Sequence, residues 1–315
     1  MKHIVVTGGC GYVGTVLTGS LLGQGFRVTV IDCQWFGNYL PSHPALTVLR
    51  EDVRNAENIP LEDAYAIIHL ANVANDPCSE LNAKLAWEVN VLATMQLVEH
   101  AIRHGVSQFI HASSGSVYGV KDEEQVTEEL SLVPISDYNK TKMISERVLL
   151  SYQDRITIQC IRPATVCGVS PRMRLDLSVN MLTMQALTKG KITVFGGGQI
   201  RPNITMMDMI SVYEHFLKLG AAAPGIYNAG FENISILDIA QMVTRFVPAE
   251  IVVTESNDPR SYRQNSDKLL ATGFAPRYRV QDAIQQVIEA YRAGTIVDDV
   301  SCYNMKAMKR QGLTG

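Results

Sequence analysis

The chain has 315 residues, of which 46% are hydrophobic and 19% charged, and its formal net charge at pH 7 is −3. This is the composition of an ordinary globular protein. The mildly negative charge, with no lysine- and arginine-rich block before a short tail at Lys306–Arg310, argues against a nucleic-acid surface. No apolar run approaches membrane-spanning length and no signal peptide is apparent, so we expect no membrane partner and a cytoplasmic location.

The metal-binding residue types show no clear site. His100 and His104 have metal-ligand spacing on a predicted helix, but no third ligand accompanies them, so we expect no metal. The cysteines lack C-x-x-C spacing and are interpreted as reduced core or turn residues. They are Cys10, Cys33, Cys78, Cys160, Cys167 and Cys302.

The first predicted element is a buried strand over Lys2–Thr7, which leads through a glycine-rich turn into a helix over Val13–Leu22. Gly8, Gly11 and Gly14 have the spacing of a dinucleotide-binding turn. In such a turn the glycines permit a tight bend, close approach of a pyrophosphate and packing of the helix on the strand. The pyrophosphate then lies at the helix N-terminus. The alternative is a plain strand–helix turn.

A second strand, Arg27–Ile31, ends in Asp32. A carboxylate at this distance from the glycine turn can accept hydrogen bonds from both ribose hydroxyls of an adenosine. It would also repel a 2′-phosphate, so NAD is favoured over NADP. The alternative interpretation of Asp32 is a solvated acid at a strand end.

Short β-branched runs then alternate with amphipathic helices, which predicts a parallel sheet covered on both faces. From about Thr165 the segments become shorter and more broken. We therefore predict an α/β fold: a Rossmann doubly wound parallel sheet over 1–165, with segments returning from the C-terminal half, and a smaller C-terminal α/β substrate lobe over 166–315. The remaining predicted strands are Leu46–Leu49, Ala66–Leu70, Gln108–Ala112, Thr157–Ile161, Ile192–Phe195 and Ile204–Met206, and the helices are Ala83–His104, Asp137–Tyr152, Leu177–Lys189, Asp208–Lys218, Ile236–Phe246 and Val280–Ala293.

The candidate chemistry lies where the strand Gln108–Ala112 runs into the hydroxyl-rich turn Ser113–Gly119. Further along, Tyr138 and Lys142 are four residues apart on a predicted helix and share a face. A tyrosine has a pKa near 10, and a neighbouring ammonium would stabilise its phenolate. Tyr138 could then take a proton from a substrate alcohol while a hydride passes to NAD, with Ser114 bonded to the same oxygen.

Taken together, these motifs resemble the extended short-chain dehydrogenase/reductases that act on nucleotide sugars, the NAD-dependent epimerase/dehydratase group that includes UDP-galactose 4-epimerase. The resemblance covers nearly the whole chain. The segments that carry it are Thr7–Gly14, Asp52–Arg54, His69–Ala71, Asn90–Val91, Ser113–Gly119, Tyr138–Lys142, Arg162–Pro163 and Arg201–Asp208.

The resemblance implies roles for individual residues. Tyr138 would be the catalytic base, Lys142 its activator and ribose anchor, and Ser114 the second hydroxyl, with Asn90 in the proton-relay group. The cofactor NAD would lie on Gly8, Gly11, Tyr12, Val13, Gly14, Asp32, Asp52, Val53, Leu70, Ala71, Tyr138 and Lys142. The nucleotide-diphosphate sugar would contact Ser114, Thr165, Asn180, Arg201 and Arg260, with both arginines on the diphosphate.

For three of these predicted substrate residues a purely structural or surface role stays open. Arg201 and Arg260 are also compatible with surface charges, and Asn180 with a structural position inside a helix. The family further implies a homodimer, formed through the helices Ala83–His104 and Asp137–Tyr152.

Departures from the family pattern limit which of the family's reactions we expect. Gly115 and Ser116 stand where the 4,6-dehydratases have an Asp-Glu pair, so we expect no dehydration. The segment Val169–Asn180 resembles a subgroup that includes GDP-heptose 4-dehydrogenases, and its Arg172 and Arg174 either contact substrate or cap the loop. Cys167, where the family often has tyrosine, is interpreted as a packing residue.

Three functions are therefore compared. An NDP-sugar 4-epimerase is favoured over an NDP-sugar 4-dehydrogenase, which would release the 4-keto sugar and shares every catalytic residue. A non-catalytic NAD-binding scaffold is disfavoured because Ser114, Tyr138 and Lys142 are all present.

Overall fold

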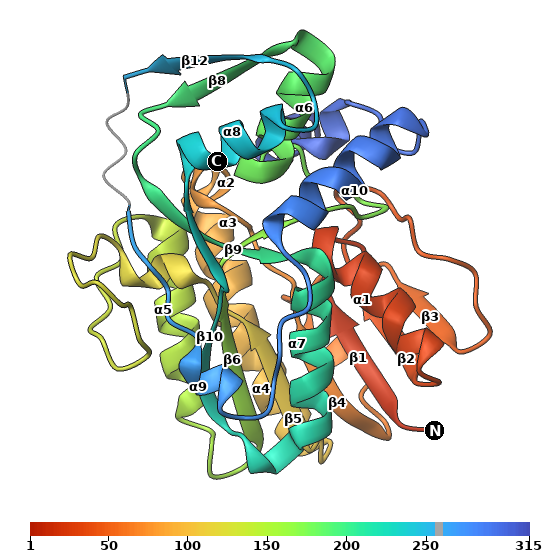
Figure 1. The fold of residues 1–315 in the computed structure, drawn as a ribbon. Coiled ribbons are helices and arrows are strands. Elements are labelled where there is room, and N and C mark those ends of the chain that lie inside the picture. The colour runs from red at the N-terminus through yellow and green to blue at the C-terminus, as the bar shows by residue number, and fades with distance from the viewer. Residues whose placement is uncertain (256–260) are drawn as a thin grey trace.

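The computed structural model describes residues 1–255 and 261–315, and its centre is a seven-stranded parallel sheet (Figure 1). The strand order is β10-β6-β5-β4-β1-β2-β3, which reverses direction beside β1, and ligands of such sheets bind at that point. The predicted doubly wound sheet is confirmed. Its strands are β1 (His3–Thr7), β2 (Arg27–Ile31), β3 (Leu46–Leu49), β4 (Ala64–His69), β5 (Gln108–Ala112), β6 (Thr157–Pro163) and β10 (Gly225–Ala229).

Helices cover both faces of this sheet, which is why its inner strands are apolar throughout. Ile4 and Val6 of β1 pack into one core and Val5 into the other. The first face carries α1 (Tyr12–Gly23) and α7 (Met206–Leu219), which contact each other. The second carries α4 (Ala93–Arg103) and α5 (Asp137–Leu150), and shorter segments complete this half of the chain. These segments are η1 (Ala56–Asn58), α2 (Asp76–Leu81), η3 (Gly115–Tyr118) and η4 (Gly220–Ala222).

The helix predicted over Ala83–His104 is interrupted by a π-helical segment. The structure has α3 (Ala83–Trp87), the π-helical η2 (Glu88–Leu92) and α4 in immediate succession. Asn90 lies in η2, where its Oδ1 accepts a hydrogen bond from the Val73 N–H at 2.8 Å. Such π-turns are frequent at functional sites.

The smaller lobe lies at one end of the sheet, around a core of its own (Figure 1). Its small sheets are β11-β9-β7 and the parallel pair β12-β8. The sequence prediction places a strand over Ile204–Met206, but β9 ends at Thr205, whose Oγ1 accepts the Asp208 N–H at 3.2 Å and caps α7. The lobe contains β7 (Thr165–Cys167), α6 (Ser178–Lys189), β8 (Lys191–Phe195), β9 (Ile200–Thr205), β11 (Glu232–Ser235), α8 (Ile236–Thr244), β12 (Glu250–Thr254) and α10 (Val280–Arg292).

Three further short helices are α9 (Asp267–Leu270), η5 (Val300–Cys302) and α11 (Asn304–Arg310). No helix in the described part of the chain is long and apolar enough to span a bilayer.

A buried ion pair joins α5 to β6. Both Glu146 and Arg162 are almost fully buried, and the guanidinium binds the carboxylate through Nε at 2.9 Å and Nη2 at 2.7 Å. Ser113 at the end of β5 donates to the same carboxylate, and Nη1 of Arg162 donates to the Tyr118 hydroxyl at 2.7 Å. The ion pair thus connects β5, η3, α5 and β6 at the carboxyl ends of the two strands.

Glu146→Gln should lower the free energy of unfolding by about 3–5 kcal/mol, because it leaves the Arg162 guanidinium buried without a counter-charge. Urea-induced unfolding followed by circular dichroism measures this loss. Glu57→Gln is the control, since Glu57 is 75% exposed in its pair with Arg103, and this substitution should cost less than about 1 kcal/mol. Equal losses in the two variants would show that the buried pair is no more important than a surface one.

Candidate active site

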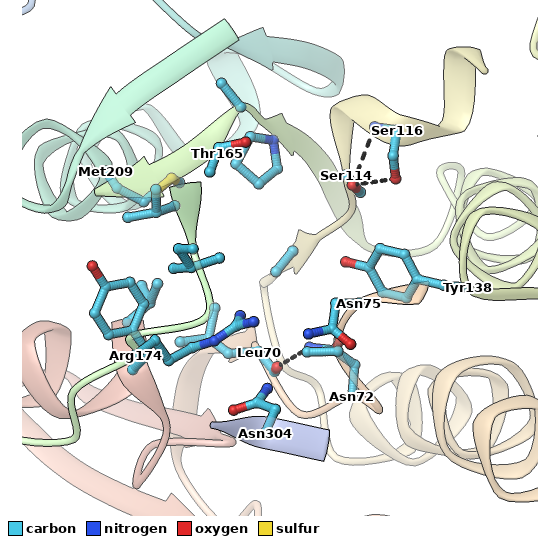
Figure 2. A pocket seen from close by; sticks show the side chains of 18 of the residues that line it. Leu70, Asn72, Asn75, Ser114, Ser116, Tyr138, Thr165, Arg174, Met209 and Asn304 are labelled. Carbon is cyan, nitrogen blue, oxygen red and sulfur yellow. Dashed lines mark hydrogen bonds between the residues drawn. The ribbon is translucent and has the colours of Figure 1, made fainter. Parts of the chain in front are cut away.

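A cavity of about 430 Å³ lies where the ends of β1, β4 and β5 meet α5 and the loop 169–177 (Figure 2). Among the described residues that line it, Lys142, Arg172, Arg174 and Arg201 are basic, whereas Asp76 and Asp176 are acidic. The cavity therefore suits an anionic ligand. The residues predicted from sequence that line it are Gly8, Tyr12, Val13, Gly14, Leu70, Ser114, Tyr138, Lys142, Thr165 and Arg201.

The glycine turn is shaped so that side chains would not fit. A Cβ on Gly8, whose φ is +73°, would lie 2.6 Å from the Ala71 nitrogen, and one on Gly14 would lie 2.3 Å from the Gly8 carbonyl oxygen. The first N–H groups of a helix have no intrahelical partner. Gly11, which precedes α1, has no side chain that could cap them, so they are left for a ligand. This cradle fits the pyrophosphate of NAD.

Asp32 lies beside this turn at the end of β2. Its carboxylate accepts the Cys10 N–H at 3.0 Å and the Gln34 N–H at 2.6 Å. Burial raises the pKa of Asp32, and these backbone hydrogen bonds oppose the shift. The position next to the glycine turn fits a carboxylate that binds ribose hydroxyls.

The other predicted NAD residues surround the turn without lining the cavity. Asp52 forms an ion pair with Arg54 at 2.7 Å, and Val53 is buried. Ala71 lies beneath Gly8, as the close approach of their backbones shows. The cofactor roles predicted for Gly11, Asp52, Val53 and Ala71 therefore stay predictions.

The two candidate catalytic hydroxyls meet in the cavity. Ser114 ends β5 and begins η3, where its Oγ accepts the Ser116 N–H at 3.2 Å and lies 2.7 Å from the Ser116 Oγ. Tyr138 lies in the first turn of α5, and its hydroxyl points into the pocket near Ser114 (Figure 2). Burial raises the pKa of Tyr138 to about 12, and the nearby Ser114 side chain opposes this shift.

Lys142 follows Tyr138 by one helical turn, but its amine is engaged elsewhere. Nζ donates to the Ala112 carbonyl oxygen at the end of β5 at 2.6 Å. Burial lowers the pKa of Lys142 to about 7, against the opposing charge of Glu146. The charged side chains that most affect the Tyr138 pKa are Asp76, which raises it, and Arg174, which lowers it. Because Nζ donates to Ala112, the predicted activation of the Tyr138 phenol by this ammonium stays a prediction.

Asn90 and Asn180 hold segments in place from behind the cavity wall. Besides Val73, Asn90 contacts α5 by donating to the Thr141 Oγ1 at 3.0 Å. Asn180, which has no exposed surface, accepts the Gly168 N–H at 3.0 Å and donates to the Tyr12 hydroxyl at 3.0 Å. Its predicted contact with substrate has no counterpart among these bonds. Arg260 lies outside the described residues.

Several polar residues that line the cavity had no role, or alternative roles, predicted from the sequence. Arg174 forms a two-point ion pair with Asp176, at 2.9 and 3.1 Å, and extends toward the middle of the pocket (Figure 2). Sequence analysis left open whether Arg172 and Arg174 contact substrate or cap the loop, and both line the cavity. Asn304 carries no local signal, because its N–H reaches Asp176 from 128 residues away at 3.2 Å. Other unassigned polar residues that line the cavity include Asn72, Asn75, Asp76, Ser178, Tyr213 and Tyr262.

The metal-binding residue types form no group of three or more His, Cys, Asp or Glu side chains arranged as ligands within residues 1–255 and 261–315. The His100 Nε2 lies 3.0 Å from the Ile59 carbonyl oxygen. Cys167 is buried in β7, with its thiol 3.5 Å from the Ile204 carbonyl oxygen, where it packs against the core of the smaller lobe.

Replacing Lys142 with Met should change how stability depends on pH. The pKa of Lys142 falls from 10.5 to about 7 on folding of the ligand-free protein, so the folded state binds fewer protons than the unfolded state between these values. Stability of the wild type therefore rises with pH across this window. Urea unfolding of NAD-free protein at pH 6.5, 8 and 9.5 should show the wild type gaining stability relative to Lys142→Met as pH rises. Parallel curves would contradict the low pKa.

Comparisons with known proteins agree with this geometry. The model of the NAD dependent epimerase/dehydratase family matches residues 4–230. An uncharacterized protein of Sinorhizobium fredii, y4nG, is 32% identical over 203 residues, which are 63% of this chain and about half, 48%, of that protein. The UDP-glucose 4-epimerase of Lactobacillus helveticus is 24% identical over 312 residues, 89% of this chain and 94% of the relative.

A solved structure extends the likeness to three dimensions. The UDP-glucuronic acid 4-epimerase of Bacillus cereus, in complex with UDP-glucuronic acid and NAD, superposes with a TM-score of 0.82 at 26% identity, over 93% of this chain and 99% of that one. The family model spans most of the chain, including the glycine turn, Ser114, Tyr138 and Lys142. The chain therefore belongs to the NAD-dependent epimerase/dehydratase family of enzymes, and its cofactor is NAD.

Proposed function

We propose that this protein is a nucleotide-diphosphate-sugar 4-epimerase. The observation that carries the proposal is that the Ser114 and Tyr138 hydroxyls lie together in a cavity rich in basic side chains beside the cofactor turn. A secondary alcohol of a sugar is the group that such a hydroxyl pair would deprotonate, and a diphosphate is the group that arginines would bind. The names of the two epimerases above both specify reaction at C4.

The chain's own residues would act on the proton of the C4 hydroxyl, while bound NAD accepts a hydride and later returns it. Tyr138 would take the proton, and Ser114 would hold the same oxygen in line. Each unit by which the Tyr138 pKa falls from about 12 requires about 1.4 kcal/mol of added phenolate stabilisation. The Ser114 side chain and the positive charge of Arg174 both act in that direction. Thr165 and Arg201, which also line the cavity, would position the sugar nucleotide.

The residues beside Ser114 support epimerisation over dehydration. Dehydration needs an acid and a base in addition to the hydroxyl pair, and positions 115 and 116 carry glycine and serine. A Cβ on Gly115 would lie 3.1 Å from the Gln264 amide oxygen and 3.2 Å from the Pro163 carbonyl oxygen, so this position has little room for a carboxylic acid. Ser116 is engaged with Ser114.

The hydrogen bonds of the loop 169–177 favour the epimerase, although the sequence of this segment resembles the subgroup that includes 4-dehydrogenases, the alternative that shares these catalytic residues. The loop's Ser170 hydroxyl donates to the Tyr12 carbonyl oxygen at 2.7 Å, and the Tyr12 hydroxyl donates to the Gly168 carbonyl oxygen at 2.6 Å. On the other side, the Leu175 N–H donates to the Cys302 carbonyl oxygen at 2.9 Å. These bonds hold the loop against the cofactor turn, and a retained cofactor would return its hydride to the sugar.

We also infer a homodimer that buries the outer surface of α3, η2 and α5. Trp87 and Leu92 are large apolar side chains with 38% and 47% of their surface exposed, and they lie on the helices for which the family resemblance implies an interface. Covering them in a second copy would remove apolar surface from water. The cytoplasmic location stays a prediction.

The reaction is tested by incubating the purified protein with UDP-, GDP-, dTDP- and CDP-sugars in turn, while NADH absorbance and product stereochemistry are followed. We expect one sugar nucleotide to be inverted at C4 without lasting NADH, because the hydride is returned. Accumulating NADH with a released keto sugar would replace the epimerase by the 4-dehydrogenase. A sugar dehydrated at C5 and C6 would contradict both.

Tyr138→Phe should reduce turnover by about 10²–10⁴-fold, the usual contribution of a general acid–base group. NAD binding should persist, because the substitution removes one hydroxyl. The matched control is Tyr152→Phe at the far end of the α5 region, where the hydroxyl contacts Glu99 at 2.7 Å, and this variant should retain full turnover. Turnover of Tyr138→Phe within tenfold of wild type would exclude the tyrosine as the base.

A further inference from the structure

Arg172 is a buried cation that forms no ion pair within residues 1–255 and 261–315, although the charges of Asp176 and Asp32 act on it. Only 3% of its surface is exposed, and its guanidinium lies 4.0 Å above the Phe36 ring. Nη2 donates to two neutral acceptors, the Asn304 Oδ1 at 2.6 Å and the Ser301 carbonyl oxygen at 3.3 Å. Nε is buried and has no hydrogen-bond partner among the described residues. The nearby Arg174 differs, because its charge is matched by Asp176.

A buried charge of this kind is costly unless an anion compensates it. Burial, followed by the like charge of Arg174, lowers the pKa of Arg172 to about 10. Asn304 and Ser301 hold Nη2 in place but contribute no negative charge. The guanidinium is thus oriented from one side, and its Nε donor is left for a ligand.

The surroundings of Arg172 identify the class of anion. It lines the same cavity as Tyr12, Val13 and Gly14, the first turn of α1, whose N–H groups form an anion cradle. Ser170, two residues earlier, donates to the Tyr12 carbonyl oxygen, so the loop is anchored on the cradle itself. Phe36, which also lines this cavity, lies four residues after Asp32, the predicted ribose ligand.

We propose that Arg172 binds the pyrophosphate of NAD, so that the loop 169–177 and the segment Ser301–Asn304 form part of the cofactor site. The sugar nucleotide also carries a diphosphate, but the contact of this loop with the glycine turn favours the cofactor's. The proposal depends on the cofactor and not on which sugar reaction the enzyme performs. It therefore stands or fails separately from the proposed 4-epimerase activity.

The test compares Arg172→Met, which removes the charge, with Arg172→Lys, which keeps it. Arg103→Met is the control, since Arg103 lies half exposed in a surface pair with Glu57. Protein freed of copurified NAD is titrated with NAD, ADP, adenosine and UDP by calorimetry or equilibrium dialysis. We expect Arg172→Met to bind NAD and ADP about ten- to a hundred-fold more weakly, as for loss of a hydrogen bond between charged groups, and adenosine and UDP unchanged. Arg172→Lys should restore part of the lost affinity for NAD and ADP.

Thermal unfolding of the NAD-free variants gives a second readout. If Arg172 is an uncompensated cation, Arg172→Met should melt at or above the wild-type temperature without NAD and gain less from added NAD. Unchanged NAD and ADP affinities would overturn the proposal. So would weakened UDP binding with NAD binding intact, which would assign Arg172 to the sugar nucleotide. If the melting temperature falls and the affinities for all four ligands weaken equally, Arg172 only caps the loop. That result would also overturn the proposal.

Discussion

The buried pair Glu146–Arg162 fixes the relative positions of the elements that carry the catalytic hydroxyls. Neither charge reaches water, so each side chain must keep its geometry or lose several kcal/mol. Glu146 is one turn beyond Lys142 and two turns beyond Tyr138 on α5, and it accepts a hydrogen bond from Ser113, the neighbour of Ser114. A shift of α5 along β5 would break this pair before it could separate the two hydroxyls.

The same network reaches the C-terminal half of the chain. The Tyr118 hydroxyl, bound to Arg162, donates to the Asn228 Oδ1 on β10 at 2.8 Å. Gln264 joins the network by donating to the Arg162 carbonyl oxygen at 2.7 Å and to the same Asn228 oxygen at 3.0 Å. Because every bond shares a partner with the next, the network acts as a unit. The network connects the Rossmann sheet with Gln264, two residues after Tyr262, which lines the cavity.

Sequence alone located the parts of the site that are specified by local backbone geometry. Gly8 and Gly14 were predictable because no other residue fits that turn, and Ser114 and Tyr138 because one ends a strand and the other begins a helix. The start of α7 at Met206 was missed because it depends on the Thr205 side-chain cap rather than on hydrophobic periodicity. The π-helical segment η2 could not be predicted, because the residue pattern of Ala83–His104 is that of an ordinary helix. The partners of Lys142 and Arg172, namely Ala112 and Asn304, are distant in the chain and are brought together only by tertiary packing.

The site combines two opposite electrostatic arrangements. Glu146 and Arg162 compensate each other fully, so their free energy does not depend on a ligand. Lys142 and Arg172 are buried cations whose hydrogen bonds go to neutral oxygens, and burial lowers the pKa of both. An anionic ligand that binds beside them recovers part of this cost, which couples ligand affinity to folding stability. The buried pair thus fixes the positions of the catalytic hydroxyls, while these two cations couple the stability of the protein to the binding of an anionic ligand.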